Sequence, residues 1–275
     1  MSQHASSDSL RHRIGMDLGN RVPLTDGVEW AADNDVKYVE FRIDHRLDGQ
    51  NPITDEEIAT VAKYREEHGV QIGLHSQSAV NVAATEPFLR DAADRYLEAY
   101  VDMAARLDAV RVVFHGGYHF TDDHEERKSA SIDRLTRVGE LAVENDVSIV
   151  ICNMNPEPAD GEIQYLCDSI EECIEYSDRL PTDAVKWAFN APHAHLRPEG
   201  IEGFLDQLDI DRIGLVRLND NNGVKEEHIP PGEGNIDFEM IFDRLEGAGY
   251  SDHYSLAFGD QQAKLDGREY LLNLV

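Results

Sequence analysis

The chain has 275 residues, of which 41% are hydrophobic, and its 54 acidic and 25 basic residues give a net charge of −29. This length suits one domain with a sizeable core, and no stretch approaches the roughly 20 apolar residues that a membrane helix needs. Nucleic-acid binding is disfavoured, because it requires clustered lysine and arginine and the sequence has no basic run. Since the acids are spread along the whole chain, we expect a salt-adapted protein from a high-salt cytoplasm.

The first residues, from Met1 to Ser9, contain no apolar segment of the kind that secretory signals carry. We therefore predict that residues 1–12 form a short mobile tail and that residues 13–275 form one domain of a cytoplasmic protein. The three cysteines, Cys152, Cys167 and Cys173, are an odd number without zinc-ligand spacing. Reduced thiols are the better interpretation.

Short apolar runs rich in β-branched residues alternate with longer amphipathic runs, which indicates strand–helix units and a parallel sheet. Strands are predicted at residues 13–17, 38–43, 71–75, 110–115, 148–153, 185–189, 213–218 and 254–258. Three helices are predicted by their starting points, which are about Thr25, the capping box at residues 54–57 and the cap Asp237. Five more are predicted over residues 87–107, 132–144, 169–179, 198–207 and 265–275. Eight such units of about 34 residues predict a single (β/α)8 TIM barrel of the α/β class. An open doubly wound sheet would need a glycine-rich phosphate turn or another crevice signature, and none is visible.

Two of the predicted strands end in a histidine. His75 ends the third strand, and His115 ends the fourth, directly before Gly116 and Gly117. A lone strand-end histidine is more often structural. However, active sites of such barrels lie at the carboxyl ends of the strands, so two histidines at equivalent positions on neighbouring strands favour a functional role.

The motifs around the strand ends resemble the xylose-isomerase-like TIM-barrel superfamily, which includes sugar-phosphate isomerases and epimerases and the endonuclease IV family. The resemblance covers essentially the whole chain after residue 13. Its most specific part is His228 followed by Pro231-Gly232-Glu233-Gly234 and a helix start. Further matches are Glu40 on strand two, His75 with Asn81 six residues later, His115, His193 three residues after Asn190, and Asp220.

The departures from this resemblance fall on the usual metal ligands. Glutamate, aspartate, histidine and glutamate usually stand at the tips of strands five to eight, where they bind a divalent metal. This chain carries Cys152, Asn190, Arg217 and Ala257 there. Mg²⁺ and Mn²⁺ need oxygen ligands, mostly anionic, so we expect the usual metal site to be degenerate.

Two other metal sites stay open. His75, His115 and Cys152 offer two nitrogens and one sulfur, which are zinc-type ligands. His193, Glu226 and His228 match the third-metal ligands of the endonuclease IV family, with glutamate in place of aspartate. In sugar isomerases the matching histidines hold substrate hydroxyls instead.

The resemblance implies a sugar or sugar-phosphate isomerase or epimerase-like protein that acts on, or binds, a small polyhydroxylated compound. His75, His115 or His193 would serve as the base, with Arg217 as a fixed cation in place of the metal. Substrate binding would fall to Glu40, Asn81, Asn190, Asp220 and His228, although a buried pair with an arginine is an equal expectation for Glu40. A non-catalytic descendant that binds a sugar-like ligand is the alternative, and an endonuclease-IV-like phosphodiesterase is the least favoured. A homo-oligomer is compatible with the sequence.

Overall fold

The computed structural model describes residues 7–47, 49–181 and 184–275, with side chains from residue 9 on. Eight parallel strands close into a barrel in the order β1-β10-β9-β8-β6-β4-β3-β2. The strands are β1 (Ile14–Gly19), β2 (Tyr38–Phe41), β3 (Gln71–His75), β4 (Arg111–His115), β6 (Ile149–Cys152), β8 (Val185–Asn190), β9 (Ile213–Leu218) and β10 (His253–Leu256). The predicted single TIM barrel is therefore confirmed.

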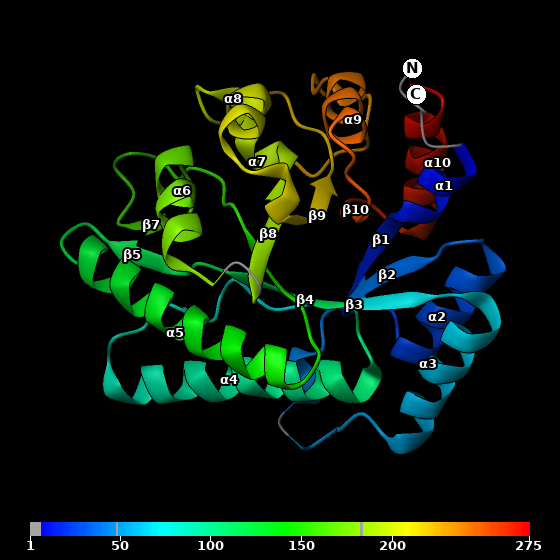
Figure 1. Cartoon of the computed structure of the whole chain (residues 1–275), viewed down its shortest axis with the longest axis horizontal. Coiled ribbons are helices and arrows are strands. Elements are labelled where there is room, and N and C mark those ends of the chain that lie inside the picture. Colours follow the sequence, from blue (N-terminus) through cyan, green and yellow to red (C-terminus); the bar gives the residue numbers. More distant parts are fainter. Residues whose placement is uncertain (1–6, 48, 182–183) are drawn as a thin grey trace.

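Helices surround the strands (Figure 1). They are α1 (Ser7–Arg13), α2 (Leu24–Asp33), α3 (Asp55–His68), α4 (Pro87–Leu107), α5 (His124–Glu144), α6 (Ile170–Arg179), α7 (Ala191–His195), α8 (Gly200–Gln207), α9 (Phe238–Gly247) and α10 (Gln261–Leu272), with short 3₁₀ turns at Asp44–Arg46 and Ile210–Arg212. Two expected caps are present, because the Thr54 hydroxyl and the Asp237 carboxylate each accept a backbone N–H at the start of their helix. The hydroxyl of Thr25 was also expected to cap its helix, but this is wrong, because α2 begins at Leu24 with Pro23 as its N-cap and has no side-chain cap. None of the helices in the described ranges is long and apolar enough to cross a bilayer.

The predicted mobile tail is wrong in part. Residues 1–6 lie outside the described residues, but Ser7–Arg13 form helix α1. Arg11 on this helix makes a bidentate ion pair with Glu269 of α10, at 2.6 and 2.7 Å, and the two helices lie side by side (Figure 1). The last helix thus anchors the segment that leads into the first strand.

Two short elements were not predicted. Strands β5 (Tyr118–Phe120) and β7 (Ile163–Tyr165) pair antiparallel outside the barrel. They follow β4 and β6, so they extend from the carboxyl ends of two neighbouring barrel strands. Their pairing positions Tyr165 beside the mouth of the barrel.

The barrel interior is a packed core of its own. It is filled by Tyr38, Val113, Val150, Cys152, Met154, Ala188 and Leu215. Tyr38 crosses the interior so closely that a Cβ on Gly73 would lie 2.3 Å from its hydroxyl oxygen. This hydroxyl donates to Glu40 Oε1 at 3.1 Å, so the core directly supports the polar layer above it.

Candidate functional site

A polar cavity of about 490 Å³ lies at the carboxyl ends of the barrel strands. The six strand-end residues that were expected to face one mouth all line it: His75, His115, Cys152, Asn190, Arg217 and Ala257. His193 and His228 also reach this cavity. The common orientation follows from the parallel register, which pairs His115 with Cys152 and Asn190 with Arg217 on adjacent strands.

The cavity floor is built around the guanidinium of Arg217. Its Nη2 donates to Asp17 Oδ2 at 2.7 Å and its Nη1 donates to Glu40. Asp17 and Glu40 are paired neighbours on β1 and β2, so both carboxylates meet the same cation. Burial would lower the pKa of Arg217, but the charges of Glu40 and Asp17 raise it above the usual value.

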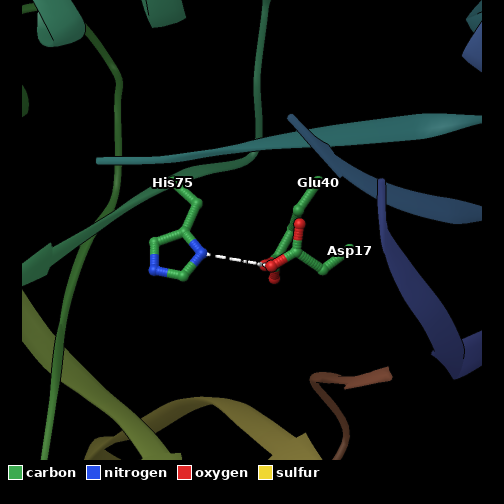
Figure 2. A group of neighbouring side chains, drawn as sticks. All are labelled: Asp17, Glu40 and His75. Atoms are coloured by element: carbon green, nitrogen blue, oxygen red, sulfur yellow. Dashed lines mark hydrogen bonds and ion pairs between the residues drawn. The ribbon is translucent and has the colours of Figure 1, made fainter. Parts of the chain in front are cut away.

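A chain of hydrogen bonds leads from this floor to the two strand-end histidines. His75 Nδ1 lies 3.3 Å from Asp17 Oδ2 (Figure 2), and His75 Nε2 lies 3.4 Å from His115 Nε2. Burial would raise the pKa of Asp17, but the hydrogen bond with His75 and the charge of Arg217 hold it well below its usual range. Burial, and then the charges of His75 and Arg217, lower the pKa of His115 well below its usual value. The result is an ionised Asp17 and a neutral His115 at neutral pH.

A second cluster of a carboxylate and histidines lies across the ring of strands, beyond β8 and β9. Glu226 Oε2 lies 3.4 Å from His193 Nε2, and Glu226 Oε1 lies 3.1 Å from His228 Nε2. His193 Nδ1 contacts the carbonyl of Asn153 at 2.8 Å, which leaves Nε2 to face Glu226 and the Asn190 amide. Burial lowers the pKa of His193 despite the nearby Glu226 charge.

The comparisons with known proteins agree with this architecture. The family model described as xylose isomerase-like TIM barrel matches residues 28–273. The chain belongs to this family. The uncharacterized protein MJ1614 of Methanocaldococcus jannaschii is 28% identical over 217 residues, which is 78% of either chain.

Another relative is named probable endonuclease 4, from Lysinibacillus sphaericus, and is 25% identical over 69% of this chain and 66% of its own length. A crystal structure titled D-tagatose 3-epimerase-like protein superimposes with a TM-score of 0.81 at 22% identity, over 95% of this chain and 96% of that one. This structural likeness shows the fold.

The xylose isomerase-like family pattern of metal ligands does not fit the side chains at these strand tips. Burial raises the pKa of the Cys152 thiol to about 11, so it is protonated and a poor metal ligand at neutral pH. Asn190 supplies a neutral amide, Arg217 a cation, and Ala257 no side-chain donor. We therefore derive no step through a divalent metal at these four positions.

The two alternative metal sets form only in part. Among the described residues, one set of three such ligand atoms lies within 4.8 Å of one another, and it comprises Asp17, Glu40 and His75 (Figure 2). His75 and His115 do meet, but Cys152 does not complete a cluster with them. In the Asp17–Glu40–His75 group, the guanidinium of Arg217 already contacts both carboxylates.

Three residues expected to bind substrate have structural roles instead. Asn81 lies outside the cavity and holds the start of β5, because its side chain bonds both the N–H and the carbonyl of Tyr118 at 2.9 Å. Asp220 is fully buried and accepts the backbone N–H groups of Gly232, Gly234 and Ile236. Glu40 lies beneath the cavity and has no exposed surface. It forms an ion pair with Arg217, which agrees with the alternative expectation of a buried pair with an arginine.

The sequence interpretation missed Asp17. It is the last residue of the predicted strand 13–17 and lies two residues before the end of β1, so it carries the same signal that drew attention to His75 and His115, namely a polar residue near a barrel strand tip. It also missed Arg42 and Lys264, which line the cavity from β2 and from α10. Arg42 stands near the end of the predicted strand 38–43, so it carries the same signal, whereas nothing in the local sequence of Lys264 distinguishes it from a surface cation.

Proposed function

We propose that the chain is an epimerase- or isomerase-type enzyme that moves a proton beside a carbonyl group of a small polyhydroxylated compound. One observation carries the proposal: two clusters of a carboxylate and histidines flank one polar cavity, and buried polar atoms without partners converge there. Among the described residues these atoms include His115 Nδ1 and Asn190 Oδ1. Buried polar groups without partners are costly, so a ligand rich in hydroxyl groups would satisfy them.

His115 is the base in this proposal. It is buried and neutral, and its contact with His75 places a second imidazole behind it. A carbon–hydrogen bond beside the carbonyl breaks, its electron pair enters an enediolate, and the proton passes to the imidazole. Asp17 stabilises the positive charge that the His75–His115 pair acquires.

In this proposal the His193–Glu226–His228 cluster donates a proton of its own to the enediolate. Solvent then takes the proton from His115 and reprotonates the cluster, so that the enzyme is restored. The cluster lies beyond β8 and β9, while His75 and His115 end β3 and β4 on the far side of the closed ring. Donation to the opposite face of the same carbon inverts that centre, and donation to the neighbouring carbon isomerises the compound. Asn190 Oδ1, which has no hydrogen-bond partner in the described structure, accepts from a hydroxyl group of the substrate beside this cluster.

Arg217 has a positioning role in the proposal, and this changes the expectation that it replaces the metal directly. Both of its terminal nitrogens are already engaged by carboxylates. Two carboxylates outweigh one guanidinium, so this cluster has no net positive charge to offer an enediolate. Its function is to hold the carboxylates of Asp17 and Glu40 in place behind His75.

Proton exchange with solvent tests the proposal without knowledge of the natural substrate. The protein is incubated in D₂O with a panel of ketoses, aldoses and keto-inositols, once with EDTA and once without it, and deuterium entering carbon positions is followed by NMR. We expect exchange with at least one compound, and a loss of about 10²–10⁴-fold in His115→Gln and in His193→Gln, as for removal of a general base. His68→Gln serves as a matched control, because His68 ends α3 just before the amino end of β3, whereas His75 stands at the carboxyl end of that strand, where the cavity lies. Equal rates in all four proteins, or exchange abolished by EDTA, would overturn the proposal.

A non-catalytic, sugar-binding descendant is the second candidate. It is favoured by the neutralisation of Asp17 and Glu40, which leaves no free carboxylate on the cavity floor. Binding of panel compounds with no exchange in any of them would select it. Phosphodiester cleavage is less supported despite the endonuclease-named relatives, because the net charge of −29 repels nucleic acid.

A further inference from the structure

One side of the cavity carries cationic side chains that have no carboxylate partner. Arg21 follows β1, Arg42 follows β2, and Lys264 lies on α10 after β10. Because β1 stands between β10 and β2 in the barrel, the three side chains converge on the same part of the mouth. In the described ranges none of them lies within 4 Å of an acidic oxygen, whereas most other cations of the chain form ion pairs.

Arg42 is the most unusual of the three. Its side chain is only partly exposed, its Nε is fully buried, and no hydrogen-bond partner for that atom exists within the described structure. The side chain folds over the end of β1, since a Cβ on Gly19 would lie 3.2 Å from Nη2. A buried guanidinium N–H without an acceptor is unfavourable, and a chain with 54 acidic residues could readily have supplied one.

Lys264 supports the same interpretation. It is buried, and its ammonium group donates to the carbonyl of Gly259 at 3.0 Å as its one hydrogen bond within the described residues. Burial lowers the pKa of Lys264, the charges of Asp17 and Asp260 raise it, and the charge of Arg21 lowers it. Lys264 and Arg21 are therefore near enough for their charges to repel each other.

We infer that Arg21, Arg42 and Lys264 form a subsite for an anionic group, a phosphate or a carboxylate, on the compound that the cavity takes. An arginine fork and an ammonium group are the usual partners of such anions. The inference rests on the proposed function, because it makes the substrate an anionic polyhydroxylated compound. The anion would sit over the ends of β1 and β2, beside the Asp17–His75–His115 chain.

Inorganic phosphate and acetate are the probes, titrated into the full chain by calorimetry at one fixed salt concentration. We expect the parent to bind one of them, and Arg42→Met and Lys264→Met each to weaken it about tenfold or more, as for a lost charge-assisted hydrogen bond. The stronger of the two probes identifies the anionic group. Arg95→Met is the matched control, because Arg95 is an exposed α4 cation whose one hydrogen bond within the described residues goes to the Asp91 carbonyl, and it should leave affinity unchanged.

The outcomes separate this inference from the proposed function. Equal affinity in all variants that circular dichroism shows to be folded, or no binding of either anion by the parent, would overturn the subsite. If a parent protein that binds neither anion still catalyses proton exchange in neutral ketoses, the proposed function is retained. Anion binding that depends on Arg42 and Lys264, with no proton exchange in any compound, would keep the subsite and overturn the enzyme.

Discussion

Replacing Arg217 by methionine tests whether the guanidinium holds the cavity floor together. The side chain is 4% exposed and lies between Glu40, which has no exposed surface, and Asp17. Methionine preserves much of the length but leaves two buried carboxylates without their cation. Loss of one partner of a buried pair costs about 3–5 kcal/mol, and we expect this range for the free energy of unfolding, because His75 still faces Asp17.

A double-mutant cycle isolates the interaction from the general effect of truncation. Glu40→Gln alone should cost less, because the amide oxygen can still accept from Arg217. In the double variant Glu40→Gln, Arg217→Met one buried negative charge is gone, so its loss should fall below the sum of the single losses by about 1–3 kcal/mol. Urea unfolding followed by tryptophan fluorescence at constant salt measures all four proteins, since urea leaves the ionic strength unchanged.

Arg244→Met is the control for an exposed pair. Arg244 contacts Asp206 at 2.6 Å on the surface, and such pairs contribute about 0–1 kcal/mol. If the Arg217 and Glu40 losses add to within about 0.5 kcal/mol, or if Arg217→Met costs no more than Arg244→Met, the floor does not depend on this ion pair and the positioning role of Arg217 is refuted.

Three further outcomes are expected. With a net charge of −29, the melting temperature should rise between about 0.1 M and 2 M salt, and a flat thermal-shift profile would contradict salt adaptation. The quadruple variant Cys152→Glu, Asn190→Asp, Arg217→His, Ala257→Glu should gain Mn²⁺ binding in calorimetry, and tight Mn²⁺ binding by the parent would show that the ligands were misplaced. Burial lowers the pKa of His115, so a decreasing pH protonates this base only below the usual histidine value. The acid limb of the pH–rate profile should therefore lie below about pH 6.5. A limb at or above that value would count against His115 as the base.

The fold could be predicted from the sequence because its signals are local and repeat. Each strand is a short apolar run, and the residues that begin or end helices, such as Thr54, Gly69 and Asp237, act through their own backbone neighbours. Helix α1 was missed for the opposite reason. Seven residues have little helical preference alone, and contacts with α10, more than 250 residues away, hold Ser7–Arg13 in place.

The candidate site could be predicted only as far as strand direction determines it. Parallel strands bring their tips together, so His75, His115 and Arg217 share one mouth. What each tip contacts depends on pairing between distant strands, as for Arg217 with Asp17 and Glu40. Asp220 shows the limit, because a carboxylate that binds a hydroxyl and one that binds backbone N–H groups look the same in sequence.

The distribution of charge connects the surface to the cavity. Inside, Arg217 neutralises the acids of the floor, and Glu226 lies between two histidines. The remaining charges are the cations Arg42 and Lys264, with Arg21 at the rim, so this part of the cavity has the opposite sign to the surface of a chain with net −29. In molar salt, electrostatic attraction reaches only about 3 Å, and long-range steering of an anion to the mouth is lost. Under those conditions an anion is recognised only by direct contact with donors that are shielded from water, and buried Arg42 Nε and the Lys264 ammonium are donors of that kind.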